Sequence, residues 1–195
     1  MSPPRSARRR FPSPRQTCPE VTAHLVEAFG RLCLITVFAW SGLQKVHGFR
    51  VFRGHVAATV PRLGGLPSDV LATAVVLIEL GIVASLVLRP LERVGLTVAL
   101  LLLTAFTAYL LRLLRTRPDA SCGCAGTSRT PVSGAHLLRN ALLLVLTVAT
   151  WWAAALTDGP SPAHYALAAA PAAVTGVVLL HLAELVSLFR TTYVT

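Results

Sequence analysis

The sequence contains few charged residues for its length. Aspartate, glutamate, lysine and arginine make up 13% of the 195 residues, whereas about a quarter is typical of a soluble domain. Hydrophobic residues make up 54%. They are gathered in blocks of about 20 residues, the length that crosses a hydrocarbon core of roughly 30 Å at about 1.5 Å per residue. The composition excludes a soluble globular domain and predicts an all-α integral membrane protein embedded in the lipid bilayer.

Lysine is almost absent, so the net charge of +10 comes from arginine. Of the 18 basic residues, 17 are arginine and one is Lys45. They lie in the N-terminal tail and in the connections between apolar blocks, and not along one amphipathic face. Membrane proteins place cations in this way, as interface anchors and topology signals. We therefore do not expect the protein to bind nucleic acid.

Five apolar blocks predict five membrane-spanning helices, at residues 24–46, 68–88, 91–114, 135–156 and 164–189. Residues 1–23, with five Arg and five Pro, are predicted to be a disordered basic tail. Residues 47–67 are too short and polar to span, and residues 157–163 predict a turn. Pro171 is expected to kink or weaken the fifth helix. The predicted organisation is the tail, a four-helix membrane domain over 24–156, and a turn with a fifth C-terminal transmembrane helix over 157–195.

An odd number of spans places the two termini on opposite sides of the membrane. A cytoplasmic N-terminus leaves eight cations on the inner side and ten on the outer side, so the total count does not decide the orientation. The arginine cluster before the first helix favours a cytoplasmic N-terminus, because the first helix usually dominates insertion. We expect a multi-pass protein of the cell membrane whose connection between the third and fourth spans is extracytoplasmic.

That connection carries two of the four cysteines, Cys122 and Cys124, separated by Gly123. Glycine lets the backbone turn tightly enough for the two sulfurs to meet. A strained, exposed disulfide is of the labile or catalytic kind, which favours a redox-active pair. A Cu(I) or Zn(II) site with further ligands from elsewhere, or a purely structural pair, stays open. Cys33 is expected to be a buried core residue, and Cys18 is assigned no role.

Two ionisable residues, Glu79 and Lys45, are predicted to lie within a membrane span or at its end, where each has a structural and a functional interpretation. Glu79 is near the middle of the second span, where a carboxyl group is either neutral or serves as a proton relay or a polar contact to a quinone or a partner. Lys45 ends the first span and either extends to the headgroups or functions with the cysteine connection. Because Glu79 is about 16 Å from that membrane face, we expect a direct Lys45–Glu79 pair only if the two helices are offset. Glu27 and Arg31, four residues apart, are expected to pair with each other or to reach the headgroups.

Four sequence fragments carry a resemblance to a known family. They are FAWSGLQKV at the end of the first span, IELGIVASLVL in the second, SCGCAG in the connection, and Arg139-Asn140 within LLRNALLL of the fourth. In this order and spacing, over roughly residues 28–150, the chain resembles the MauE family of methylamine-utilisation membrane proteins, which is related to the DoxX-like group. Ala125 stands where the family motif usually has Phe, so an aromatic docking contact is in doubt while both thiols remain.

The resemblance implies a protein that matures a disulfide-rich exported partner, as in maturation of the small subunit of methylamine dehydrogenase. One of Cys122 and Cys124 would attack a mixed disulfide and the other would resolve it, with a thioredoxin-like protein as a further partner. By analogy with four-helix thiol oxidases, a quinone would accept the electrons. No second cysteine pair is visible on the same face, which favours an accessory maturation protein over an independent thiol-disulfide oxidoreductase. The alternatives are a Cu- or Zn-handling protein and a non-catalytic membrane assembly factor.

Overall fold

A computed structural model describes residues 18–59, 67–116 and 134–192 of the chain. Cys122 and Cys124 lie outside the described residues. The regular elements of the described part are all helices, and it contains no strand. Its elements, in chain order, are α1 (Cys18–His47), α2 (Phe49–Thr59), α3 (Ser68–Val87), η1 (Arg89–Leu91), α4 (Glu92–Thr116), α5 (Gly134–Leu156) and α6 (Pro162–Thr192).

The five predicted membrane spans are confirmed. The helices α1, α3, α4, α5 and α6 are each long and apolar enough to cross a membrane. Their ends lie within a few residues of the predicted ones, except that α1 begins at Cys18 and so includes residues 18–23, which were assigned to the tail. The protein is therefore an all-α, multi-pass membrane protein.

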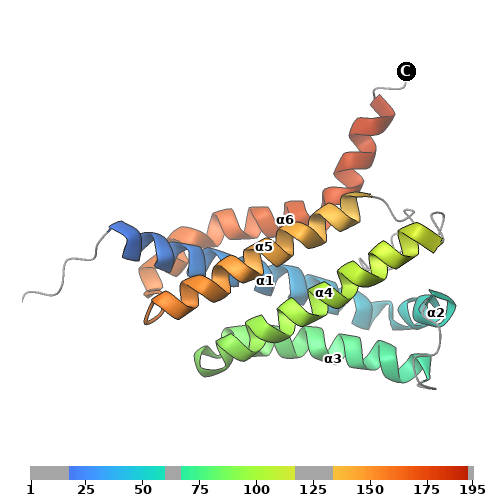
Figure 1. Cartoon of the computed structure of the whole chain (residues 1–195), viewed down its shortest axis with the longest axis horizontal. Helices are drawn as coiled ribbons and strands as arrows, with labels where there is room; N and C mark the ends of the chain where they lie inside the picture. Colours follow the sequence, from blue (N-terminus) through green and yellow to red (C-terminus); the bar gives the residue numbers. More distant parts are fainter. Residues whose placement is uncertain (1–17, 60–66, 117–133, 193–195) are drawn as a thin grey trace, which may run out of the picture.

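The first helix is the centre of the bundle. It packs against α3, α5 and α6, while α4 lies against α3 and α5 (Figure 1). The main core is formed by buried apolar side chains from all five spans, among them Cys33, Leu34, Ile82, Leu96, Leu143 and Ala172. Because α6 packs along α1, the fifth helix is part of the bundle. The helix continues through Pro171, and its C-terminal part leaves the bundle at an angle (Figure 1).

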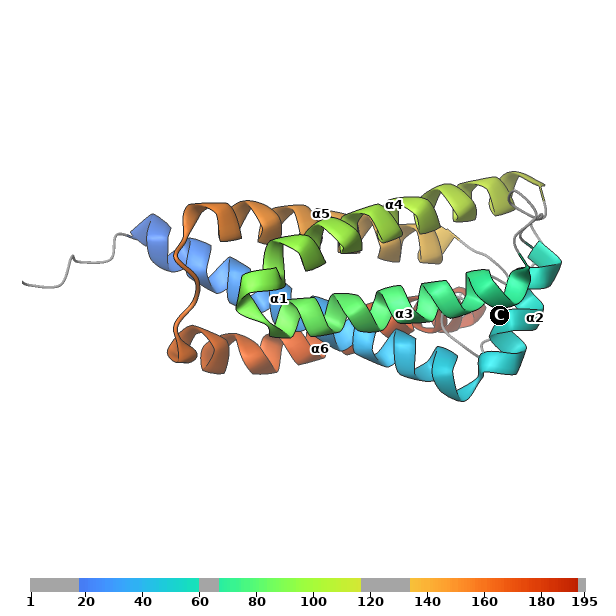
Figure 2. The ribbon, with the colours of Figure 1, turned by 90° about the horizontal axis from the view of Figure 1, so that it is seen from below.

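The bundle has two ends with different connections (Figure 2). At one end, here called the α2 end, α1 and α4 finish, α3 and α5 begin, and α2 lies across the helices. At the other end, here called the η1 end, α1 begins, η1 joins α3 to α4, and residues 157–161 join α5 to α6. Segment 117–133, which carries the two cysteines, therefore starts and finishes at the α2 end.

The sequence did not predict α2, because its 11 residues are too few to cross a membrane. Phe52 and Val56 of α2 pack against Ala72 and Val76 of α3 and form a small second core. These α3 residues lie in the first half of the helix, so α2 fills the space beside α3 that the end of α1 leaves open. The consequence is that α3 extends beyond α1 at this end of the bundle.

Candidate functional site

Lys45 and Glu79 form a buried ion pair at the α2 end. Lys45 Nζ donates to Glu79 Oε1 at 2.6 Å and to Ser41 Oγ at 2.7 Å. The side chains of Lys45 and Glu79 are 1% and 2% exposed. The pair, which was expected only for offset helices, forms because the helices are offset. With the ends of α1 and α3 at one level it would not form, but α3 extends beyond α1 and brings Glu79 opposite the last turns of α1.

Aromatic rings cover the ammonium group of Lys45. Its Nζ lies 5.6 Å from the ring centre of Phe52 in α2 and 5.8 Å from that of Phe106 in α4. The face of an aromatic ring attracts a cation, more strongly where water is excluded. Lys45 therefore does not extend to the headgroups, and α2 seals the pair from the aqueous side of the bundle.

The first turns of α5 add a second cation to this cluster. Arg139 is buried and its charge acts favourably on the Glu79 carboxylate. Asn140 is buried at the next position. Two further buried atoms, Glu79 Oε2 and His136 Nε2, have no hydrogen-bond partner among the described residues. The structure thus brings together Lys45, Glu79 and Arg139 from three helices.

This cluster can hold a charge in a place from which water is excluded. Removing an ion pair from water is costly unless the geometry is good and the remaining polar atoms are satisfied. Intramembrane ionisable residues of this kind face the bundle interior and mark functional sites by default. Chemically, the Lys45–Glu79 pair offers a proton donor and acceptor in contact, with the Ser41 hydroxyl as a third group.

Among the four cysteines, the structure describes the side chain of Cys33. Cys33 is fully buried within the main core and is free, which confirms the expected core role. Cys122 and Cys124 stay predictions. Within the described ranges, no group of three or more His, Cys, Asp or Glu side chains could hold a metal ion.

A second buried polar cluster, at the η1 end, centres on Arg31. Its Nη1 donates to Glu92 Oε2 and to Tyr165 Oη, both at 2.8 Å. Its Nε and Nη2 donate to the carbonyl oxygens of Leu86 and Val87 at 2.5 and 3.2 Å. Those carbonyls belong to the last turn of α3, which has no further helical N–H groups to satisfy them. Arg31 therefore ties α1, α3, α4 and α6 together.

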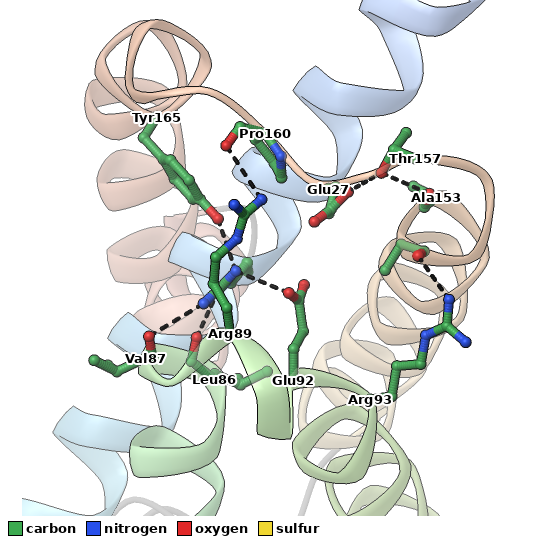
Figure 3. A network of polar contacts seen from close by, with 12 residues as sticks. Glu27, Leu86, Val87, Arg89, Glu92, Arg93, Ala153, Thr157, Pro160 and Tyr165 are labelled. Carbon is green, nitrogen blue, oxygen red and sulfur yellow. Dashed lines mark hydrogen bonds and ion pairs between the residues drawn. The ribbon is translucent and has the colours of Figure 1, made fainter.

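Sequence reasoning missed this cluster by pairing Arg31 with Glu27. Glu27 instead accepts a hydrogen bond from Thr157 Oγ1 (Figure 3). The ion-pair partner of Arg31 is Glu92. The sequence pattern assigned no role to Glu92, which begins α4 two residues after Pro90. The only available signal was the low number of acidic residues in the chain, which makes each one within a span a candidate for burial.

A polar cavity of about 400 Å³ opens beside the Arg31 cluster. Its charged and polar lining residues are Glu27, Arg89, Glu92, Arg93, Thr157 and Asp158. Arg89 and Arg93 also donate to the carbonyl oxygens of Pro160 and Ala154 at 3.4 and 3.3 Å, as Figure 3 shows. These two arginines hold the α5–α6 connection over the cavity.

Comparison with known proteins gives the chain a family. The model of the family described as "Methylamine utilisation protein MauE" matches residues 23–153. A relative from Paracoccus denitrificans, "Methylamine utilization protein MauE", is 34% identical over 137 residues, which cover 66% of this chain and 73% of the relative. No solved structure matches the chain. The family match spans α1 to the end of α5, and with it Lys45, Glu79, Arg139 and the cysteine segment. The chain belongs to the MauE family.

Proposed function

We propose that the protein exchanges thiols and disulfides with an exported partner during maturation of that partner, in the service of methylamine metabolism. The observation that carries the proposal is that α4 finishes and α5 begins at the α2 end of the bundle, on either side of segment 117–133. The same end holds the buried Lys45–Glu79 pair. Membership of a family described by methylamine utilisation supports the metabolic setting.

The exchange begins with the Cys122–Cys124 disulfide and a dithiol of the partner. A partner thiolate attacks one sulfur of the loop disulfide, which forms a mixed disulfide and releases the other loop sulfur as a thiolate. The partner's second thiolate then attacks the mixed disulfide. The partner leaves with a new disulfide, and Cys122 and Cys124 hold two electrons and two protons as thiols. A membrane quinone would be the acceptor for continued turnover, since it can take up these two electrons and two protons.

The ion cluster suits this chemistry because thiolates are the reacting species. Lys45 and Arg139 place two cations around the single carboxylate of Glu79. Cations near a thiol favour its ionised form. The buried pair also supplies a group that can exchange a proton when thiols form or ionise, and the proposed roles of Lys45, Glu79, Arg139 and Asn140 are to support the loop and not to react with the partner.

The proposed orientation places the η1 end in the cytoplasm and the α2 end outside. Five arginines precede α1, which begins at the η1 end. Dense positive charge before the first span retains that side in the cytoplasm. An exported partner would then meet the cysteines on the side where disulfides form and persist.

Trapping of the mixed disulfide tests the proposal. In a C18S/C33A background, either C122S or C124S leaves one loop thiol. As a thiolate it attacks the disulfide of the oxidised partner, the reverse of the exchange, and forms a mixed disulfide while one partner sulfur leaves as a thiolate. The missing loop cysteine can then no longer break this mixed disulfide. We expect one of these two variants to accumulate a disulfide-linked adduct with an exported cysteine-rich protein, visible on non-reducing gels and lost on reduction. The C122S/C124S variant is the matched control and should give no adduct and no growth on methylamine.

Two results would contradict the exchange. Full support of growth on methylamine by C122S/C124S would mean that the bundle acts as an assembly factor without thiol chemistry. Purified protein that carries stoichiometric copper or zinc, with the metal lost in C122S/C124S and no adduct in either single variant, would mean that the pair handles metal.

A further inference from the structure

The η1 end contains two acidic side chains that face each other inside the bundle. Glu27 of α1 and Glu92 of α4 are 1% and 7% exposed, and both line the polar cavity. Figure 3 shows the two carboxyl groups close to each other. They are near enough for their like charges to repel, and for a hydrogen bond to form when one of them carries a proton. A hydrogen bond between two carboxyl groups requires that one of them carries a proton.

One oxygen of this pair is satisfied only if a proton is present. Glu92 Oε2 accepts from Arg31 and Glu27 Oε2 accepts from Thr157. Glu92 Oε1 receives no hydrogen bond from any donor in the described part of the chain. Water does not satisfy it either, because the side chain is only 9% exposed. A buried acceptor without a donor costs roughly 1–3 kcal/mol. The neighbouring carboxyl group becomes the missing donor when it is protonated.

The balance of buried charges also favours one proton on the Glu27–Glu92 pair. Among the described residues, Arg31, at 4% exposure, is the one buried cation with an ion pair to either carboxyl group, and its partner is Glu92. With Glu27 and Glu92 both ionised, this buried set has one negative charge in excess. Two adjacent carboxylates do not both ionise readily, because like charges at close range disfavour the charged form. One shared proton leaves one negative charge, which Arg31 balances.

The other ionisable groups around the pair lie at the cavity mouth or the ends of α1 and α6. Arg89, Arg93 and Asp158 border the cavity and are exposed. Tyr165 donates no charge and accepts from Arg31. One turn before Glu27, His24 stacks on His164 with ring centres 5.1 Å apart. The three arginines, counting Arg31, disfavour a metal or organic cation in the cavity but do not prevent a proton from reaching a carboxyl group.

We propose that Glu27 and Glu92 form a proton-binding carboxyl pair that holds one proton between them and exchanges it through the cavity at the η1 end. The ligand of this site is the proton itself. The site is separate from the cysteine segment, which is attached at the opposite end of the bundle. Loss of the proton leaves an uncompensated negative charge against Arg31, so the tie between α1, α3, α4 and α6 responds to pH from the η1 side.

Infrared spectroscopy of the full chain in lipid nanodiscs tests this pair directly. A protonated carboxyl group gives a carbonyl stretch that is separate from carboxylate and amide bands and shifts in deuterated water. We expect such a band near neutral pH in the unsubstituted protein and its loss in both E27Q and E92Q, because the one carboxyl group that remains no longer faces a like charge and ionises. The matched control is E184Q, which removes an exposed carboxyl group and should keep the band.

A second measurement needs no variant and stays informative if E27Q or E92Q fails to fold. A hydrophobic carbodiimide reacts with protonated carboxyl groups in membranes, and mass spectrometry locates the product. Modification at Glu27 or Glu92, decreasing as the pH is raised, is the expected result. The proposal is overturned if the unsubstituted protein has no protonated-carboxyl band, if the band survives in E27Q or in E92Q, or if the carbodiimide modifies neither residue.

Discussion

The ammonium group of Lys45 lies 2.6 Å from the carboxylate of Glu79, and both side chains are almost fully buried. One residue comes from the end of α1 and the other from the middle of α3. Their contact is possible because α3 extends beyond the end of α1, so that Glu79 lies opposite the last turns of α1. The pair therefore depends on the arrangement of three helices, and its removal should affect the whole α2 end.

Breaking the Lys45–Glu79 pair from one side should destabilise the protein strongly. K45M or E79L leaves the other group buried without its partner, which typically costs about 3–5 kcal/mol. The K45M/E79L double variant should recover much of this loss, because no charge then remains buried. Unfolding in mixed detergent micelles measures each free energy, and a double-mutant cycle gives the coupling between the two residues.

The Arg53–Asp69 pair provides a matched control for that cycle. It also joins residues of the α2 end, at 3.3 Å, but the side chains are 48% and 60% exposed. Exposed pairs contribute roughly 0–1 kcal/mol, so R53M and D69N should change the free energy of unfolding little. A coupling for Lys45–Glu79 as small as that for Arg53–Asp69 would contradict the buried arrangement.

Replacing Arg31 by lysine should also be costly, although the charge is kept. The guanidinium group donates in four directions, to Glu92, Tyr165 and the carbonyls of Leu86 and Val87. A lysine ammonium group has three donors and no planar fork. We expect R31K to lose about 3 kcal/mol, since each buried group left without a partner costs roughly 1–3 kcal/mol.

The smaller change Y165F separates the hydroxyl from the rest of this cluster. It removes one acceptor of Arg31 and leaves the other three, so we expect a loss of about 1 kcal/mol. Thermal unfolding of both variants in the same detergent compares them. An R31K protein as stable as Y165F would show that Arg31 does not hold the end of α3.

Close packing between α1 and α5 requires glycine at position 30. A Cβ atom placed there would overlap the hydroxyl oxygen of Thr150 and lie 3.0 Å from its Cβ. We expect G30A to destabilise the protein by at least about 1–3 kcal/mol, the usual cost of overpacking. T150A should rescue G30A in part, because it removes the hydroxyl but keeps the Cβ.

Gly81 is the control for this packing prediction. It also lies in a membrane span, but nothing is within 4 Å of a Cβ placed there. We expect G81A to change the free energy of unfolding by less than about 1 kcal/mol. Equal effects of G30A and G81A would mean that the approach of α1 to α5 is not as close as the structure has it.

The sequence predicts the helical membrane fold well because length and apolarity are local properties. Blocks of about 20 apolar residues mark a span wherever they occur, and the five spans follow from them. The helix α2 was not predicted because it does not cross the membrane. Its apolar side chains, Phe52 and Val56, are recognisable only once their contacts on α3 are known.

The residues of the candidate site could be predicted from the sequence, but the contacts between them could not. Glu79 and Lys45 stand out in the sequence because ionisable residues in spans are rare. Their pairing depends on the relative displacement of α1 and α3, which no local pattern records. The same holds for Arg31, whose neighbour in sequence, Glu27, is not its partner, while Glu92 and Tyr165 come from distant helices.

The central claim, an oxidised cysteine pair outside the cytoplasm, is tested most directly by thiol labelling in intact cells. The C18S/C33A variant keeps Cys122 and Cys124 as its only thiols. A membrane-impermeant maleimide should label this variant only after prior treatment with a reductant. Labelling that requires permeabilised cells, with or without reductant, would place the pair on the cytoplasmic side and contradict both the orientation and exchange with an exported partner.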